Sequence, residues 1–145
     1  MNKKRILIID DESSFTRMVK LNLECLGGYA VLEVNRPHEA LRGARTFQPD
    51  LILLDVIMPG VDGGEVAAKL RADPQLCGVP IVFLTATVSL PEAGRSGLNS
   101  GGFLFLAKPV ALADLIACIT RQLDAQAVPA IPSPAVAGAR QSVAA

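Results

Sequence analysis

Short apolar runs and amphipathic segments alternate along most of the chain. Five of the runs have the length of a strand and are bounded by polar or turn-forming residues; they span residues 5–9, 29–34, 51–54, 81–84 and 103–107. The run from Leu51 to Leu54 has none of the apolar–polar alternation of a half-exposed strand. We therefore expect this strand to be buried on both faces, as strands of parallel sheets are.

The segments between these runs have the spacing of apolar residues that favours helices. They cover about residues 14–26, 37–47, 64–72, 91–98 and 112–123. The fourth is the weakest, because Gly94 and Gly97 each cost roughly 1 kcal/mol relative to alanine inside a helix. Five strands that alternate with five helices predict an α/β fold with a doubly wound, five-stranded parallel sheet.

The first two helices carry finer predictions about their starts and their buried faces. Ser13 or Ser14 is available to cap the first helix, and Asn35 is available to cap the second. The apolar residues expected on the inner face of the first helix are Phe15, Met18, Val19, Leu23 and Leu26.

Residues 1–126 are predicted to form one domain, because the chain has 145 residues, half of them apolar. From Val128 onward the composition changes to proline, alanine, serine and valine without periodicity. We expect residues 127–145 to be a disordered Pro/Ala-rich tail. No output domain follows the predicted sheet, so the sequence is interpreted as a stand-alone module.

Composition excludes several classes of function. Lysine plus arginine and aspartate plus glutamate number 14 each, so no basic field favours direct nucleic-acid binding. The apolar run Ile6–Ile9 that follows the basic N-terminus is too short for membrane insertion, and we expect a cytoplasmic protein. The cysteines Cys25, Cys77 and Cys118 have neither disulfide-framework nor zinc-site spacing and are predicted to be reduced core thiols. His38 is predicted to be a surface residue.

Polar residues follow four of the five predicted strands. These are Asp10 and Asp11 after the first, Asp55 after the third, Thr85 after the fourth and Lys108 after the fifth. The carboxyl ends of parallel strands meet at one edge of the sheet, where open α/β sheets place their ligands. Clustered carboxylates repel one another unless a cation lies among them, and oxygen ligands alone favour Mg²⁺ or Mn²⁺. Such a cation would attract a phosphoryl group.

Four motifs in this order resemble the receiver domain of two-component response regulators. They are Ile8-Ile9-Asp10-Asp11-Glu12, Leu53-Leu54-Asp55-Val56-Ile57-Met58-Pro59-Gly60, Leu84-Thr85-Ala86 and Lys108-Pro109, and the resemblance covers about residues 4–125. It implies a flavodoxin-like (βα)5 fold with strand order 2-1-3-4-5.

The resemblance also implies the chemistry of the site. Asp55 would accept a phosphoryl group from a phosphohistidine of a sensor histidine kinase or histidine phosphotransfer protein. Mg²⁺ would be held by Asp11, Asp55 and the backbone carbonyl of Ile57, with Asp10 acting mainly through a metal-bound water. Lys108 and the hydroxyl of Thr85 would contact the phosphoryl oxygens.

The resemblance further implies a switch that carries the signal to a downstream protein target. Phe105 matches the switch aromatic, whose rotamer follows Thr85, and the surface of the fourth helix, fifth strand and fifth helix would rearrange. An ordinary strand residue is the alternative for Phe105. The protein would be a monomer or a phosphorylation-dependent dimer. No general base is apparent at Ile57 or Thr87, which flank the line of attack, so we expect slow self-hydrolysis.

Two other functions compete with a phosphorylation-controlled signalling module, which is not a turnover enzyme. A Mg²⁺-dependent phosphatase of the haloacid dehalogenase type also uses an aspartate nucleophile after a strand. That class has its nucleophile in an Asp-x-Asp arrangement after the first strand, whereas this chain has Asp10-Asp11-Glu12 there. A pseudo-receiver would act only as an unphosphorylated interaction surface, which the complete set of acids, threonine and lysine argues against.

Overall fold

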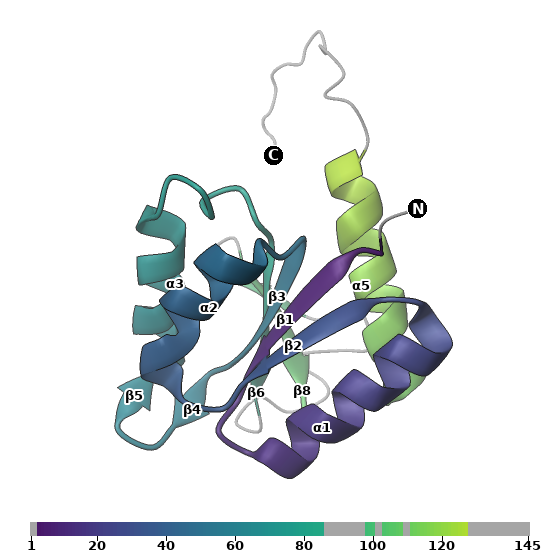
Figure 1. Cartoon of the computed structure of the whole chain (residues 1–145), viewed down its shortest axis with the longest axis horizontal. Helices are drawn as coiled ribbons and strands as arrows, with labels where there is room; N and C mark the ends of the chain where they lie inside the picture. The colour runs from purple at the N-terminus through teal and green to yellow at the C-terminus, as the bar shows by residue number, and fades with distance from the viewer. Residues whose placement is uncertain (1–2, 86–97, 101–102, 109–110, 128–145) are drawn as a thin grey trace, which may run out of the picture.

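A computed structural model describes residues 3–85, 98–100, 103–108 and 111–127. One sheet has the strand order β2-β1-β3-β6-β8-β7. Its members are β1 (Arg5–Ile9), β2 (Ala30–Val34), β3 (Leu51–Asp55), β6 (Ile81–Thr85), β7 (Leu98–Ser100) and β8 (Phe103–Ala107). The described α-helices are α1 (Ser13–Asn22), α2 (Ala40–Phe47), α3 (Gly63–Ala72) and α5 (Leu112–Ala127). Helices α2 and α3 lie on one side of the sheet, and α1 and α5 on the other (Figure 1).

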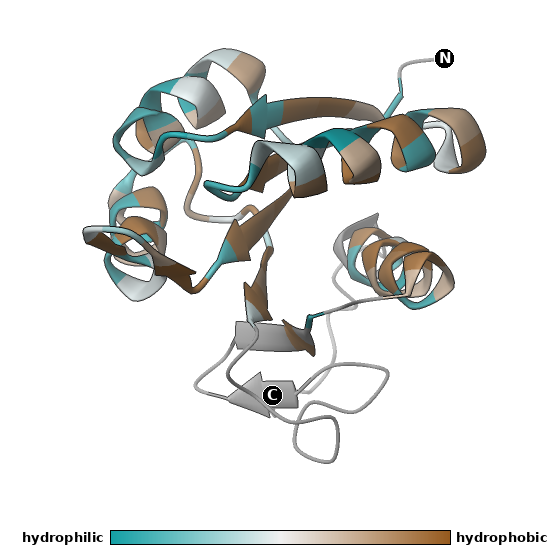
Figure 2. Ribbon diagram, turned by 90° about the horizontal axis from the view of Figure 1, so that it is seen from below, coloured by the Kyte–Doolittle hydropathy of each residue, from teal (hydrophilic) through white to brown (hydrophobic). Residues whose placement is uncertain are grey.

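The predicted parallel sheet is confirmed. Strands β2, β1, β3, β6 and β8 pair in parallel, in the expected order 2-1-3-4-5. Leu51–Leu54 are all fully buried, as their uninterrupted apolar pattern predicted. Side chains along β1 alternate between two cores: Ile6 and Ile8 pack with α1 and α5, whereas Leu7 and Ile9 pack with α2 and α3. Hydropathy colouring shows the strands as largely apolar (Figure 2).

The sheet has one strand that the sequence did not predict. β7 pairs antiparallel with β8, and Leu98, which we assigned to the end of the fourth helix, lies opposite Phe105 in this pair. The rest of that predicted helix, residues 91–97, lies outside the described residues. A separate two-stranded hairpin, β4 (Ile57–Met58) and β5 (Val61–Asp62), follows β3.

The predicted helix caps are wrong. Glu12 precedes α1 without a side-chain hydrogen bond, and its carbonyl accepts from the backbone N–H groups of Phe15 and Thr16. A 3-10 turn from Pro37 to Glu39 precedes α2, and it too starts without a side-chain cap. Asn35 instead donates hydrogen bonds to the carbonyl of Asp10, which directly follows β1, and to the hydroxyl of Thr16 in α1. Helix α3 has the described side-chain cap: Asp62 accepts from the backbone N–H of Gly64 at 2.9 Å.

The predicted inner face of the first helix is correct only in part. Val19 and Leu23 are buried and Phe15 packs on the core, but Met18 and Leu26 are exposed. A π-helical turn from Leu23 to Gly27 follows α1 and ends at Gly28 in the left-handed conformation. Because this turn is wider than an α-helical one, Leu26 leaves the stripe that a uniform period of 3.6 residues predicts.

Cysteine positions correct a further expectation. Cys118 is buried, but Cys25 and Cys77 are exposed, so only one of the three is a core thiol. His38 lies at the surface, as predicted. Helix α5 continues to Ala127, so the predicted tail at 127–145 is wrong at its first residue. Residues 128–145 of that tail lie outside the described residues. Within the described ranges, no helix combines the length and apolarity needed to cross a bilayer.

At the edge of the sheet opposite the carboxyl ends of the strands, an ion pair joins α2 to the residue that follows α3. The Nε of Arg45 in α2 lies 2.6 Å from Oδ2 of Asp73, whose Oδ1 accepts from the backbone N–H of Gln75 at 2.8 Å. These hydrogen bonds lower the pKa of Asp73 below its ordinary value of 3.8.

We expect Arg45→Ala to lower the melting temperature at neutral pH, because Asp73 loses a charge-assisted hydrogen bond. A lowered folded-state pKa gives stability that is present above the ordinary pKa and is lost as pH falls through the folded value. Thermal unfolding at about pH 7 and about pH 3 should therefore show a smaller difference from wild type in acid. An equal difference at both pH values would contradict the assignment.

Candidate functional site

Three carboxylates converge at the carboxyl edge of the parallel strands. One oxygen each from Asp10, Asp11 and Asp55 lies within 4.8 Å of the others. Asp10 and Asp55 are buried, whereas Asp11 is exposed. The convergence predicted from the strand ends is therefore present, and it consists of two buried acids and one exposed acid.

Asp10 is the most completely hydrogen-bonded of these acids. Its Oδ1 accepts from the backbone N–H of Glu12 at 3.0 Å, and its Oδ2 accepts from Nζ of Lys108 at 2.6 Å. Its backbone N–H donates to the carbonyl of Val34 at 3.1 Å, and its own carbonyl accepts from Nδ2 of Asn35 at 2.8 Å. Every polar group of this fully buried residue thus has a partner.

Asp55 is held by the backbone around the end of β3. It lies opposite Leu84 of β6, and the next residue, Val56, donates its N–H to the Leu84 carbonyl at 3.1 Å. Gly63, at the start of α3, lies so close that a Cβ there would come within 2.5 Å of the Asp55 carbonyl oxygen. Only glycine fits this approach, which sets the β4–β5 hairpin and α3 directly against the site.

Burial and the neighbouring charges shift the pKa of Asp55. Desolvation, followed by the negative charge of Asp10, raises the pKa of Asp55 to about 6. The positive charge of Lys108 and a hydrogen bond from the backbone N–H of Ile57 oppose this shift, and Asp11 adds to it. Near neutral pH the carboxylate is ionised at a cost, which a bound cation would remove.

Lys108 supplies the positive charge of the site. Its Nζ lies 2.6 Å from Asp10 Oδ2, 3.6 Å from Asp55 Oδ1 and 3.9 Å from Glu12 Oε1. The ammonium group also stands 4.6 Å from the centroid of the Phe15 ring, within the range of a cation–π interaction. Burial alone would lower the pKa of Lys108, but the hydrogen bond to Asp10 and the surrounding acids raise it above 10.5.

Thr85 and Ile57 lie at strand ends beside this group, whereas Phe105 lies further back along β8. Thr85 is buried at the end of β6, and its carbonyl accepts from the backbone N–H of Lys108 at 2.8 Å, which fixes the two strand ends together. Ile57 is 61% exposed beside Asp55, at the start of β4. Phe105 pairs through its backbone with Phe83, and its side chain lies outside what the structure describes.

Sequence reasoning missed two contributors. Phe15 was assigned only to the core, although its ring also faces Lys108. Asn35 was assigned to a helix cap, although it binds the Asp10 carbonyl. The signal for Asn35 was available: it directly follows the second strand and so lies at the same sheet edge as the acids.

The family model described as the response regulator receiver domain matches residues 6–120. The chain belongs to this family. Receiver domains are the phosphorylation-controlled modules of two-component signalling, and they interact with histidine kinases and phosphotransfer proteins.

Named relatives agree with this assignment. The transcriptional regulator RpaA of Synechocystis is 36% identical over 116 residues, 78% of this chain and 46% of RpaA. The regulatory protein PhoP of Bacillus subtilis is 46% identical over 86 residues, 59% of this chain and 34% of PhoP. The chain spans about half the length, or less, of these curated relatives. The crystal structure of a CheY-like receiver domain protein from Methanospirillum hungatei matches with a TM-score of 0.72 and 31% identity, covering 86% of this chain and 97% of that one.

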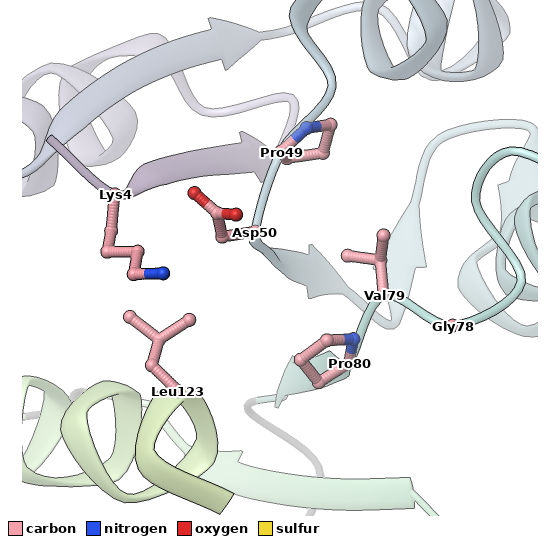
Figure 3. Close-up of a pocket in the computed structure, with 7 residues that line it drawn as sticks. All are labelled: Lys4, Pro49, Asp50, Gly78, Val79, Pro80 and Leu123. Carbon is pink, nitrogen blue, oxygen red and sulfur yellow. The ribbon is translucent and has the colours of Figure 1, made fainter. Parts of the chain in front are cut away.

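A hollow at the opposite edge of the sheet differs in chemistry from the acidic site. Its volume is about 230 Å³, and it lies between the starts of β1, β3 and β6 and the end of α5 (Figure 3). Lys4 and Asp50 are its charged lining residues. Asp50 already accepts a hydrogen bond from the backbone N–H of Arg5 at 2.8 Å, which joins β1 to β3.

Replacing Asp55 should stabilise the receiver domain when divalent cations are absent. A folded-state pKa raised to about 6 gives stability that is present below the ordinary 3.8 and is lost as pH rises through the folded value. We expect Asp55→Asn to raise the melting temperature by several degrees at about pH 7, and by much less at about pH 4.

Thermal unfolding in a chelator tests this, with Asp124→Asn on the exposed side of α5 as the matched control that should change neither value. A melting temperature for Asp55→Asn that falls at neutral pH would show that the charged carboxylate is not destabilising.

Proposed function

We propose that this chain is a phosphoacceptor module in which Asp55 receives a phosphoryl group from a phosphohistidine. The observation that carries the proposal is the meeting of Asp10, Asp11 and Asp55 within 4.8 Å, with Lys108 Nζ 3.6 Å from Asp55 Oδ1. A carboxylate nucleophile, further acids and a cation on one strand edge match the family's chemistry. The donor would be a sensor histidine kinase or a histidine phosphotransfer protein.

The reaction is a simple transfer. One Oδ of Asp55 attacks phosphorus, the P–N bond to the donor imidazole breaks, and the imidazole leaves with the bonding electron pair. The chain contributes position and charge. Lys108 faces the developing charge on the phosphoryl oxygens, and the Thr85 hydroxyl, at the end of the neighbouring strand, is assigned a second contact there.

The donor set fits a hard divalent cation. Carboxylate oxygens without histidine or cysteine suit Mg²⁺, or Mn²⁺. A positive ion would also offset the burial and the repulsion by Asp10 that raise the pKa of Asp55. Asp11, Asp55 and the backbone carbonyl of Ile57 are the proposed ligands, and Asp10 is assigned a role through water. When bound, Mg²⁺ would neutralise phosphoryl charge and align the donor with Asp55.

Lys108 would change partners during this cycle. The shortest contact of its Nζ is to Asp10 Oδ2, at 2.6 Å, whereas Asp55 Oδ1 lies 3.6 Å away. Once another positive charge balances the acids, Lys108 can turn from Asp10 toward the group on Asp55. Its backbone hydrogen bond to Thr85 would couple this movement to the end of β6.

The output would be a change of surface, not a released product. We assign Thr85 and Phe105 to a switch that alters the face formed by β8 and α5 and the segment between β6 and β8, for recognition by a downstream protein. The chain would assist its own phosphorylation and slow dephosphorylation without acting as a turnover enzyme. Steady turnover of a phosphate ester would instead indicate a phosphatase.

Incubation with acetyl phosphate and Mg²⁺, followed by intact mass measurement, tests the proposal. Wild type should gain one phosphoryl group, and Asp55→Asn should gain none, because an amide oxygen is a far weaker nucleophile. The matched control is Asp62→Asn, on the same sheet edge, since asparagine caps α3 as well as aspartate does. Undiminished labelling of Asp55→Asn would refute the assignment.

Asp11→Ala should weaken Mg²⁺ binding and slow phosphorylation together. The cation loses a charged oxygen ligand, while the fold loses little because Asp11 is exposed. Calorimetric titration with Mg²⁺ measures the first effect and labelling by acetyl phosphate the second. Unchanged Mg²⁺ affinity with slowed labelling would separate the two roles and remove Asp11 from the ligand set.

A further inference from the structure

A chain of polar side chains connects the acidic loop to β2 and α1. The Nδ2 of Asn35 donates both to the Asp10 carbonyl, at 2.8 Å, and to the Thr16 hydroxyl, at 2.9 Å. The Thr16 hydroxyl lies 2.7 Å from Glu33 Oε1 and 3.1 Å from the Ser13 carbonyl. Thr16 is fully buried, whereas Asn35 and Glu33 are partly exposed.

The direction of each hydrogen bond follows from the donors available. Asn35 Nδ2 has two hydrogens, which serve Asp10 and Thr16. Thr16 accepts from Asn35, so its single hydrogen goes to the closer acceptor, the Glu33 carboxylate. Arg17 Nε lies 3.8 Å from the other oxygen of Glu33 and balances its charge. Two hydrogen bonds therefore run in sequence from Asn35 through Thr16 to the Glu33 carboxylate, and a third runs from Asn35 to the Asp10 carbonyl.

We infer that Asn35 and Thr16 are positioning residues for the cation site, an inference that rests on the function proposed above. The carbonyl of Asp10 belongs to the peptide group that leads into Asp11. By holding that carbonyl, Asn35 fixes the plane of this peptide and hence the direction in which Asp11 leaves β1. Thr16 holds Asn35 in turn and ties it to the first turns of α1.

Fixing the loop matters because the three acids repel one another. Without a restraint, the exposed Asp11 would relieve that repulsion by swinging its backbone away from Asp10 and Asp55. A cation would then have to bring the loop back, and the free energy of doing so would be subtracted from its affinity. Replacing a residue that hydrogen-bonds to a metal ligand commonly weakens metal affinity by about 10-fold to 100-fold.

The test compares Mg²⁺ affinity with stability in the full chain. Asn35→Leu keeps a similar shape but removes both donors, and we expect its Mg²⁺ dissociation constant to rise by about 10-fold. Arg45→Ala, which removes a fold-stabilising hydrogen bond at the far edge of the sheet, is the matched control. It should lower the melting temperature and leave the Mg²⁺ dissociation constant unchanged.

A second pair of variants guards against a folding defect in the first. Thr16→Val removes the hydroxyl and keeps the shape, so it should weaken Mg²⁺ binding by less than Asn35→Leu, because Asn35 can still reach Asp10. Thr16→Ser keeps the hydroxyl and should restore wild-type affinity. This rescue is a result that a merely structural role of Thr16 would not produce.

Two outcomes overturn the inference. One is a lowered melting temperature with unchanged Mg²⁺ affinity in Asn35→Leu and Thr16→Val, which would make the polar chain purely structural. The other is equal weakening in Thr16→Val and Thr16→Ser, which would exclude the hydroxyl as the cause. Absence of Mg²⁺ binding to the wild-type protein is a different result, since it would remove the proposed cation site itself.

Discussion

Repulsion among three carboxylates at one sheet edge is the constraint on which the site depends. In the described structure Lys108 is the cation placed among them, and its shortest contact is to Asp10, not Asp55. Burial, followed by the charge of Asp10, raises the pKa of Asp55 to about 6, and Lys108 offsets this shift only in part. The receiver domain holds a local destabilisation that a divalent cation can relieve, and this links cation binding directly to folding stability.

The buried parallel sheet holds the backbones of these acids in place against that repulsion. Asp10 and Asp55 extend two neighbouring strands whose apolar residues are fully buried, so neither backbone can retreat without opening the core. Gly63 closes the site from the side of α3, and the hydrogen bond between Lys108 N–H and the Thr85 carbonyl joins the ends of β8 and β6. The packing and the backbone hydrogen bonds of the sheet thus keep the acidic side chains close together at its carboxyl edge.

The parallel strands were predictable because uninterrupted apolar runs leave few alternatives, and the acids were predictable because they directly follow those runs. The face of α1 was not. Thr16 occupies its buried stripe together with Val19 and Leu23, and a polar residue there is acceptable because Glu33 and Asn35 satisfy its hydroxyl. A prediction from apolar periodicity assigns a threonine to the exposed face of the helix, so it shifts the predicted buried face of α1 toward Met18. The same network hid the role of Asn35, since a partner distant in sequence replaces the expected helix cap.

The raised pKa of Asp55 gives the cation a second task beyond charge neutralisation. A protonated carboxyl is a poor nucleophile, so at pH values near or below about 6 the metal-free site would hold much of Asp55 in an unreactive form. A divalent cation competes with that proton for the same oxygens. On the proposed function, cation binding would then both neutralise charge at the site and keep Asp55 ionised. Lys108 cannot do this alone, because its closest hydrogen bond stabilises the charge of Asp10. Lys108 lies closest to Asp10, so a divalent cation, when bound, would be the partner that favours the ionised form of Asp55 at pH values near or below about 6.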